Sequence, residues 1–376
     1  MWKTASVLVG IVLVLITLGI VMLASTSGVH GETQFGDASY FLKRQALALA
    51  LAIPVFFVMA RIDYRLWRMG AIPLYVVTVV LLIMALTPGI GVTIKGSSRW
   101  IRFGPYFNFQ PSELAKMTVV IFLAWYMTRM QRRAGEFLKG LVVPLILLGM
   151  IAGLIFLAPD FGTTMLVGLA GMILMFVGGT RIGYLLVTGI SGGALFAIAV
   201  MQDALRMRRV IAFLNPYEYA RDEAYQLLNA IYAFVVGGPR GVGLGQSLQK
   251  RFYLPESHTD FIFAIIGEEL GLTASLGVVL LFAALFCCGV RISMHAPDLF
   301  GKITAFGITL IITLQAAFNI AVVTGCLPTK GLPLPFISYG GSSLFVTTAM
   351  IGLLVNIALR SDEDGPNIGA DQAFTV

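Results

Sequence analysis

Long apolar runs separated by short polar segments dominate the pattern of side chains along this chain of 376 residues. A helix that crosses the hydrocarbon core of a bilayer needs about 20 mostly apolar residues. Because unpaired backbone groups are costly in lipid, apolar runs of this length predict transmembrane α-helices. Ten runs fit the pattern, and they predict helices at 5–25, 43–60, 71–88, 111–128, 141–158, 163–179, 182–201, 261–290, 303–325 and 342–360.

The composition agrees with this pattern. Hydrophobic residues make up 58% of the chain, charged residues make up 12%, and the mean hydropathy is +0.88. A soluble domain has roughly 45–50% apolar and about 25% charged residues, so the composition excludes a soluble globular fold. We predict an all-α polytopic membrane protein in which residues 1–360 form a single transmembrane domain. The run at 5–25 is longer than the apolar core of a signal peptide, so we expect an uncleaved first helix.

Lys and Arg residues in short loops predict the orientation of the chain in the membrane. The loops at 61–70 and 129–140 are basic, so we place them and both termini in the cytoplasm. The acidic tail, 361–376, is then a cytoplasmic segment that we predict to be disordered. The same orientation places a long loop, about 202–260, on the outer side. The net charge of +7 favours contact with anionic lipid, and no pattern indicates a nucleic-acid partner.

A second outer segment, about 327–343, is rich in Pro and Gly and yet apolar. Pro and Gly disfavour a continuous helix. Irregular backbone at membrane depth is tolerated only inside protein or beside a water-filled cavity. We therefore predict a re-entrant loop that lines a cavity, with Lys330 as its charged residue.

Carboxylates occur at three further places on the predicted outer side. Glu113 lies in the first turn of a helix that begins at Pro111, and Lys116 follows three residues later on the same face. These two residues form either a local ion pair or one wall of a polar cavity. Asp160 lies between two apolar runs, where it either caps the returning helix or adds a carboxylate to that cavity.

Asp260 stands at the junction of a polar segment and the apolar run at 261–290. It is either a simple helix cap or a partly desolvated carboxylate that accepts a proton from a substrate. The outer cations Arg99 and Arg102 contact lipid headgroups, pair with nearby acids, or form a cationic surface for an anionic substrate such as a lipid diphosphate. From the residues alone, we predict an outward-facing cavity that contains carboxylates and cations.

The polar segments together resemble the SEDS family of shape, elongation, division and sporulation proteins. They occur in the family's order and are GSSRWI at 96–101, QPSELAK at 110–116, PDFGT at 159–163, LPESHTDFIFAIIGEELG at 254–271 and LPTKGLPLPFISYGGSS at 327–343. The resemblance implies a peptidoglycan glycosyltransferase of the bacterial cytoplasmic (inner) membrane. Such an enzyme polymerises lipid II into a lipid-linked glycan at the outer face, together with a class B penicillin-binding protein that cross-links the product.

The segments 243–247 and 327–341 resemble the division-type members of the family more than the elongation-type members. The resemblance therefore implies a place at the division septum with other membrane proteins of the division complex. It also implies that Asp260 is the essential aspartate, acting as a general base, with inversion at the anomeric carbon of the donor. The substrate-binding residues that we infer from the matching segments and the outer cations are Arg99, Arg102, Glu113, Lys116, Asp160, Glu256, His258, Lys330 and Ser338.

The diphosphate that leaves in such a reaction needs positive charge, which the cations or a bound divalent ion (Mg²⁺ or Mn²⁺) would supply. Two other functions are alternatives for a chain of this pattern. One is a lipid II flippase, which would need charge near the middle of the membrane and alternating access. The other is a non-catalytic scaffold that activates the penicillin-binding protein. A role in elongation is the alternative to a role in division.

Overall fold

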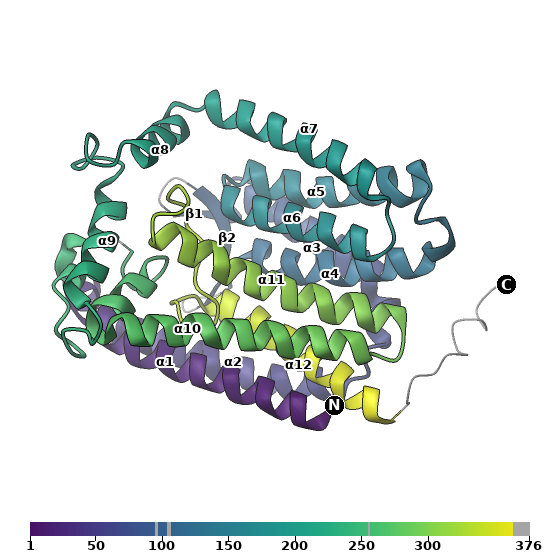
Figure 1. Cartoon of the computed structure of the whole chain (residues 1–376), viewed down its shortest axis with the longest axis horizontal. Helices are drawn as coiled ribbons and strands as arrows, with labels where there is room; N and C mark the ends of the chain where they lie inside the picture. The colour runs from purple at the N-terminus through teal and green to yellow at the C-terminus, as the bar shows by residue number, and fades with distance from the viewer. Residues whose placement is uncertain (95–96, 104–106, 255, 364–376) are drawn as a thin grey trace.

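The computed structural model describes residues 1–94, 97–103, 107–254 and 256–363. Within these residues, helices pack side by side along the long axis of the molecule (Figure 1). The α-helices are α1 (Trp2–Phe35), α2 (Tyr40–Arg61), α3 (Leu66–Leu86), α4 (Pro111–Arg129), α5 (Val143–Leu157), α6 (Phe161–Val177), α7 (Ile182–Met201), α8 (Ala204–Leu214), α9 (Tyr225–Gly237), α10 (Ile262–His295), α11 (Leu299–Val323) and α12 (Gly341–Glu363). Three short helical segments are η1 (Gln131–Arg133), η2 (Phe137–Val142) and η3 (Gln249–Tyr253).

Each of the ten predicted apolar runs is helical, which confirms the polytopic architecture. Among the described residues, eight helices are long and apolar enough to cross a membrane, namely α1, α2, α3, α5 together with η2, α7, α10, α11 and α12. The two remaining runs are α6, an apolar helix of 17 residues, and α4, whose first turns carry Glu113 and Lys116. The predicted disordered tail, 361–376, begins inside α12, which continues to Glu363, and residues 364–376 lie outside the described residues.

Two long connections, the one after α3 and the one over 202–260, contain secondary structure that the sequence did not predict. The segment that follows α3 forms an antiparallel sheet of β1 (Gly91–Ile94), β2 (Ser97–Phe103) and β3 (Phe107–Phe109), in the order β1-β2-β3. The segment 202–260 contains α8, α9 and η3 instead of a plain loop. These elements are short, and their apolar patterns are weaker than those of the spans, so periodicity did not reveal them.

α10 is interrupted at Gly271, although the sequence predicted one continuous helix over 261–290. Gly271 has φ +79°, a conformation that favours glycine because a Cβ would clash with the backbone. The connection after α9 inserts into the break. There the N–H of Val242 donates to the carbonyl of Glu268 (2.9 Å), and that of Gly243 donates to the carbonyl of Glu269 (3.0 Å). Carbonyls that the helix leaves unpaired are thereby satisfied.

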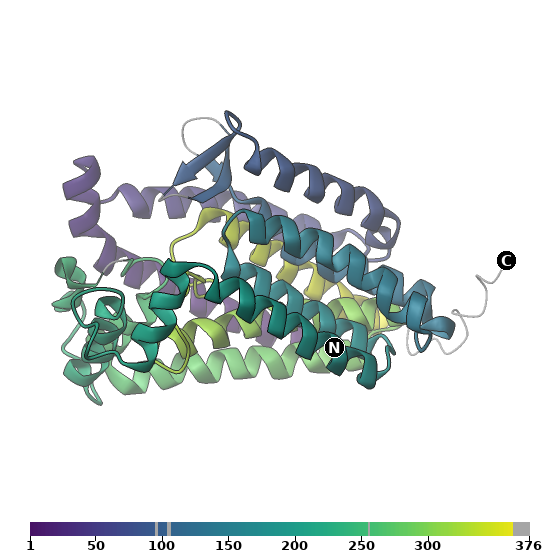
Figure 2. The same ribbon diagram turned by 90° about the horizontal axis from the view of Figure 1, so that it is seen from above.

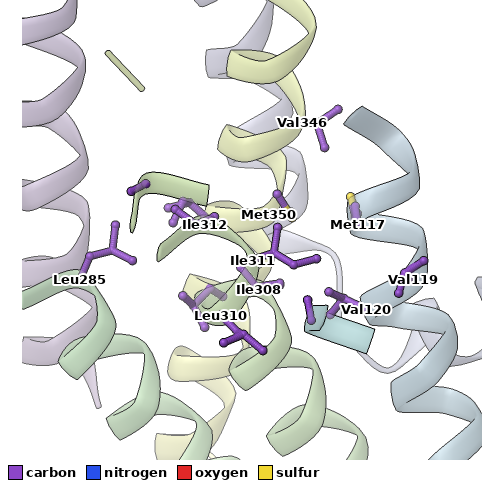
Figure 3. Packing of buried hydrophobic residues seen from close by; sticks show 14 of the residues in the cluster. Met117, Val119, Val120, Leu285, Ile308, Leu310, Ile311, Ile312, Val346 and Met350 are labelled. Atoms are coloured by element: carbon purple, nitrogen blue, oxygen red, sulfur yellow. The ribbon is translucent and has the colours of Figure 1, made fainter. Parts of the chain in front are cut away.

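α11 lies at the centre of the bundle, where it packs against α4, α6, α10 and α12. Figure 3 shows Ile308 and Ile311 of α11 between Val120 of α4 and Met350 of α12. All four side chains are fully buried. By contrast, α7 runs along one edge of the bundle in Figure 1, and its buried residue, with the whole helix described, is Leu185.

The two ends of the bundle differ. At one end, the amino group of Met1 pairs with Asp362 at 2.6 Å. At the other end lie β1–β3 and the first turns of α4, α6, α10 and α12, which we call the sheet end (Figures 1 and 2). The Ser342 hydroxyl donates to the carbonyl of Asn108 at 3.0 Å, which joins the start of α12 to β3. The segments that the sequence marked as polar meet at this end.

Candidate functional site

A cavity of about 880 Å³ opens at the sheet end. Residues from α1, α2, β2, β3, α4, α6 and α8 line it, together with the segments 222–226, 256–261 and 329–343. The last of these segments is the predicted re-entrant loop, and it contributes eight of the lining residues. Six of the predicted site residues line the cavity, namely Arg99, Glu113, Asp160, Glu256, Asp260 and Lys330.

Asp260 is held by its backbone and lies against the re-entrant loop. The side-chain amide of Asn319, from α11, donates to the backbone carbonyl of Asp260 and to that of Leu332, both at 2.7 Å. A methyl group built on Gly331 would lie 2.7 Å from Oδ2 of Asp260. The carboxylate is therefore packed against a glycine backbone at the cavity wall, which limits the directions in which it can turn.

Ser338 fastens the re-entrant loop to the segment that carries Asp260. Its hydroxyl donates to the carbonyl of Thr259 at 2.6 Å and accepts from the N–H of Leu334 at 2.8 Å. The side-chain amide of Gln45, on α2, donates to the Ser338 carbonyl at 3.4 Å and accepts from the N–H of Gly340 at 3.2 Å. Ser338 does not line the cavity, so its contacts indicate that it orients the loop.

Asp160 caps α6, as one of the two sequence interpretations proposed. Oδ1 accepts from the N–H of Thr163 at 3.2 Å, and Oδ2 accepts from the Gln110 amide and the Ser112 hydroxyl at 3.2 and 3.3 Å. The Arg99 guanidinium lies 3.9 Å from Oδ1. Capping and a place in the cavity are therefore compatible, because one oxygen serves the helix while the residue also borders the open space.

Two cations border the cavity beside α6. The Arg99 guanidinium also donates to the carbonyl of Ala158 at 3.0 Å and to that of Pro159. Lys330 lies over the ring of Phe196 in α7, with 5.3 Å between its ammonium and the ring centroid. Burial lowers the pKa of Lys330 below its ordinary value. An anion that enters the cavity beside Lys330 would favour the charged form of this amine.

Glu113 and Lys116 form the ion pair that their spacing predicted. Their side chains lie 2.6 Å apart and are 4% and 1% exposed. The ammonium of Lys116 also donates to the amide oxygen of Gln315 at 2.7 Å, and the Gln315 amide donates to the carbonyl of Pro333 at 2.7 Å. A buried network thus connects α4, α11 and the re-entrant loop. Glu113 borders the cavity, whereas Lys116 lies behind it.

The remaining predicted residues also lie away from the cavity. His258 is buried, with its ring 4.6 Å from that of Phe41. Arg102 is exposed on β2 and is not among the lining residues. Lys116, His258 and Ser338 lie behind the residues that line the cavity. Neither these three residues nor Arg102 is among the lining residues.

The sequence did not single out several residues that line the cavity. Arg44, Tyr40 and Tyr339 are the most notable, because each is polar. Tyr339 lies within the unusual segment 327–343, but no pattern assigned it a role. Arg44 lies in the first turns of α2, just after a polar stretch, and this pattern is typical of a basic residue at a membrane surface. Only the packing of α2 on α1 and α12 brings it to the cavity.

Glu268 and Glu269 form a second buried network beside the break in α10. The Lys250 ammonium lies 2.8 Å from Glu269 and 3.0 Å from the hydroxyl of Ser25 on α1. The Ser247 hydroxyl donates to Glu268, and its N–H donates to Glu269 at 3.3 Å. This network fastens the connection between α9 and α10 to two helices.

The site thus presents one carboxylate at a confined position, other carboxylates within hydrogen-bond networks, and cations around one open space. Such a set can accept a proton and can bind an anionic group. Within residues 1–94, 97–103, 107–254 and 256–363, no three His, Cys, Asp or Glu side chains come close enough together to hold a metal ion. The fold and the site define a polytopic membrane protein with a polar reaction chamber at one end.

Comparisons with known proteins agree with this class. The sequence profile of the cell cycle protein family of FtsW, RodA and SpoVE matches residues 5–363. A protein of Geobacter sulfurreducens named "Probable peptidoglycan glycosyltransferase FtsW" is 43% identical over 342 residues, which cover 91% of each chain. The stage V sporulation protein E of Bacillus subtilis is 40% identical over 355 residues, which cover 94% of this chain and 96% of that protein.

Two solved structures share the fold. A chain from a structure described as showing how a peptidoglycan synthase complex coordinates polymerisation and crosslinking has a TM-score of 0.80 at 27% identity, covering 97% of this chain and 99% of that one. The rod shape determining protein RodA of Thermus thermophilus has a TM-score of 0.69 at 27% identity, with 95% and 97% covered. The chain belongs to the FtsW, RodA and SpoVE family, which is the SEDS family that its motifs indicated.

Proposed function

We propose that this protein is a peptidoglycan glycosyltransferase that polymerises lipid II into β-1,4-linked glycan strands at the outer face of the bacterial cytoplasmic membrane. Relatives that are 43% and 38% identical over most of the chain carry the name peptidoglycan glycosyltransferase FtsW, which supports this activity and a role in division. The position of Asp260 carries the proposal, because a carboxylate packed on Gly331 borders a cavity large enough for sugars.

In this proposal Asp260 is the general base. It takes the proton from the 4-hydroxyl of the acceptor sugar while that oxygen forms a bond to the anomeric carbon of the donor. The bond from that carbon to the diphosphate breaks, and the electron pair leaves with the diphosphate. Attack from the opposite face inverts an α-linked donor to a β-linked product. Because diphosphate is a good leaving group, a second carboxylate acting as an acid is less necessary than in glycoside hydrolysis.

Positive charge stabilises the diphosphate as it leaves. Arg99 and Lys330 border the cavity and are the proposed contacts for one diphosphate. Lys116 lies too deep for direct contact, so we assign it the role of holding Glu113 and the re-entrant loop in place. A divalent ion, Mg²⁺ or Mn²⁺, is a further candidate. With no cluster of three ligating side chains among the described residues, the diphosphate oxygens would supply much of its coordination.

We further propose that both termini face the cytoplasm and that the sheet end faces outward, with residues 1–360 forming one domain. The pairing of Met1 with Asp362 agrees with two termini on one side. The proposed partner is a class B penicillin-binding protein at the division septum, with other membrane proteins of the division complex. The likeness to a chain from a peptidoglycan synthase complex supports a partner of this kind.

A polymerisation assay tests the proposal. Purified protein, with and without its class B partner, is given labelled lipid II in the presence of penicillin, which blocks cross-linking, and moenomycin, which blocks unrelated polymerases. We expect a ladder of glycan strands on a gel. A preparation that makes no ladder under either condition, yet moves lipid II across vesicle membranes, would support the flippase alternative instead.

Gly331 provides a test of how the site is built. We expect Gly331→Ala to fold and to reduce polymerisation by at least about tenfold, because effects of this size follow displacements of about 1 Å in an active site. The added methyl would push the Asp260 carboxylate away, since it would lie 2.7 Å from Oδ2. Gly277→Ala is the control, because Gly277 of α10 is not among the lining residues and a Cβ there meets nothing within 4 Å. Equal ladders from both variants would contradict the placement of Asp260.

A further inference from the structure

Arg44 is held in a defined orientation at the cavity by aromatic side chains. Its guanidinium carbon lies 4.5 Å from the ring centroid of Tyr40, in a cation–π contact. The ring of Tyr40 is in turn stacked on Phe35, with 3.8 Å between centroids and 7° between planes. Residues Phe35, Tyr40 and Arg44 all line the cavity. Arginine guanidinium groups stack on aromatic rings and bind phosphates through N–H groups in the guanidinium plane.

Tyr339 adds a second contact from the re-entrant loop. Burial raises the pKa of the Tyr339 phenol, and the nearby Arg44 guanidinium acts in the opposite direction. The Tyr339 ring also packs edge-on against Phe41 at 5.1 Å. Arg44 therefore borders the cavity between α2 and the loop, supported from both sides. Such support reduces the side-chain entropy that an anion contact would otherwise cost.

Arg44 and the pair of Arg99 and Lys330 lie on different walls of the cavity. Arg44 belongs to α2, which packs on α1 and α12. Arg99 contacts Asp160 at the start of α6, and Lys330 contacts Met165 of α6. In the contacts of the described residues, α6 packs on α4, α5, α7 and α11. The cavity therefore has positive charge on its α2 wall and on its α6 wall.

Asp260 borders the same cavity, on the segment 256–261. Its carboxylate is packed against Gly331, which is next to Lys330 in the chain. On the other side, the carbonyl of its neighbour Thr259 accepts from Ser338, whose own carbonyl accepts from Gln45, next to Arg44. The proposed base and the cations of both walls therefore border one chamber.

The proposed reaction joins two molecules that each carry a lipid diphosphate. In the proposed reaction both diphosphates are bound in the chamber at the same time. The base must reach the acceptor hydroxyl, which attacks the anomeric carbon of the donor. Two anions in one small cavity repel each other unless each is paired with positive charge. A single cationic group could not pair with both.

We propose that Arg44 is the anchor of a second lipid-diphosphate subsite, on the α2 wall, separate from the subsite at Arg99 and Lys330 on the α6 wall. The inference rests on the proposed polymerase function and specifies where its two substrates bind. Arg44 contacts substrate in this arrangement but takes no part in proton transfer. Its loss weakens binding of one substrate and shortens the strands, because a weakly held strand dissociates sooner.

Binding stoichiometry tests the two-subsite arrangement without any catalysis. Geranylgeranyl diphosphate serves as the probe, titrated into the purified full-length protein in detergent. We expect about two probe molecules per wild-type chain and about one for Arg44→Gln and for Arg99→Gln, with weak binding to the double variant. Binding of a single probe molecule to the wild type, or unchanged binding to Arg44→Gln, would overturn the inference.

Polymerisation kinetics give a second, independent measurement. For Arg44→Gln we expect at least about a tenfold rise in the lipid II concentration that gives half-maximal rate, together with shorter strands. Arg44→Lys should recover part of the loss, because it keeps the charge but not the planar group stacked on Tyr40. Lys43→Gln is the matched control, since Lys43 is exposed, pairs with Asp37 and is not among the lining residues.

The outcomes separate this inference from the proposed function. A wild-type protein that binds two probe molecules but forms no glycan would leave the two subsites standing and remove the polymerase. If the wild type forms glycan strands and Arg44→Gln forms strands of the same length with the same dependence on lipid II concentration, the second subsite alone is ruled out. A lower maximal rate with unchanged concentration dependence and strand length would assign Arg44 a purely structural role and also overturn the inference.

Discussion

Asp260→Asn is expected to abolish the glycan ladder, with a loss of about 10²–10⁴-fold in rate. The amide keeps the size of the carboxylate, so packing against Gly331 and the backbone contacts to Asn319 should persist. It cannot accept a proton from the acceptor hydroxyl at neutral pH. The measurement is the initial rate of strand formation from labelled lipid II, with the class B partner present, for wild type and variant.

Asp37→Asn is the matched control for this prediction. Asp37 lies in the turn between α1 and α2, binds Lys43 and Ser39, and is not among the lining residues. We expect its rate to stay within about twofold of wild type, because surface changes outside a site have small effects. If Asp260→Asn folds, binds the partner and still polymerises lipid II, the protein is a polymerase but Asp260 is not its general base.

The same variant separates the enzyme from the scaffold alternative in cells. A scaffold that only activates the penicillin-binding protein would tolerate Asp260→Asn, provided that the variant inserts into the membrane and binds its partner. A glycosyltransferase would not support growth. We expect loss of growth in a strain that depends on this protein, with normal amounts of the variant in the membrane.

Lys116→Met is expected to produce the largest loss of stability, about 3–5 kcal/mol in the free energy of unfolding. The change leaves the Glu113 carboxylate, 4% exposed, without its cation, and it removes a hydrogen bond from Gln315. The network to the re-entrant loop at Pro333 is then incomplete. The measurement is thermal or denaturant unfolding of the purified protein in detergent, together with polymerisation of the fraction that remains folded.

The double variant Glu113→Gln with Lys116→Met tests the reason for that loss. Removing both charges avoids the unpaired buried carboxylate, so the double variant should be more stable than Lys116→Met alone. We still expect weak polymerisation, because the wall between α4 and the re-entrant loop would be altered. Strictly additive effects of the two changes would mean that the ion pair is not the source of the stability.

Sequence patterns predicted those parts of the site that depend on neighbouring residues. Pro111 at the start of α4, Glu113 in its first turn and Lys116 three residues later indicated an ion pair, and the structure contains it at 2.6 Å. Asp160 was predicted as a possible helix cap, and it accepts from the N–H of Thr163. Such features span a few residues of one helix, where spacing alone determines which side chains meet.

Contacts between distant segments could not be predicted in this way. The partners of Glu269 include Ser25 and Lys250, which lie 244 and 19 residues away in the chain. The stack of Arg44 on Tyr40 is local, but its position at the cavity depends on α12 and the re-entrant loop. The interruption at Gly271 also looks like any glycine in an apolar run until the connection after α9 is placed against it.

The sequence by itself determined that this protein is a bundle of membrane helices with polar segments at one end, because apolar runs of this length have few other stable structures. Its ordered motifs also determined the family. Only the tertiary structure decided which polar side chains reach the open cavity. In the structure Lys116, His258 and Ser338 are buried behind the residues that line the cavity, whereas Arg44 lines it. The reason is that the exposure of a side chain to the cavity depends on how the helices pack against one another. The pattern of neighbouring residues in the sequence does not show that packing.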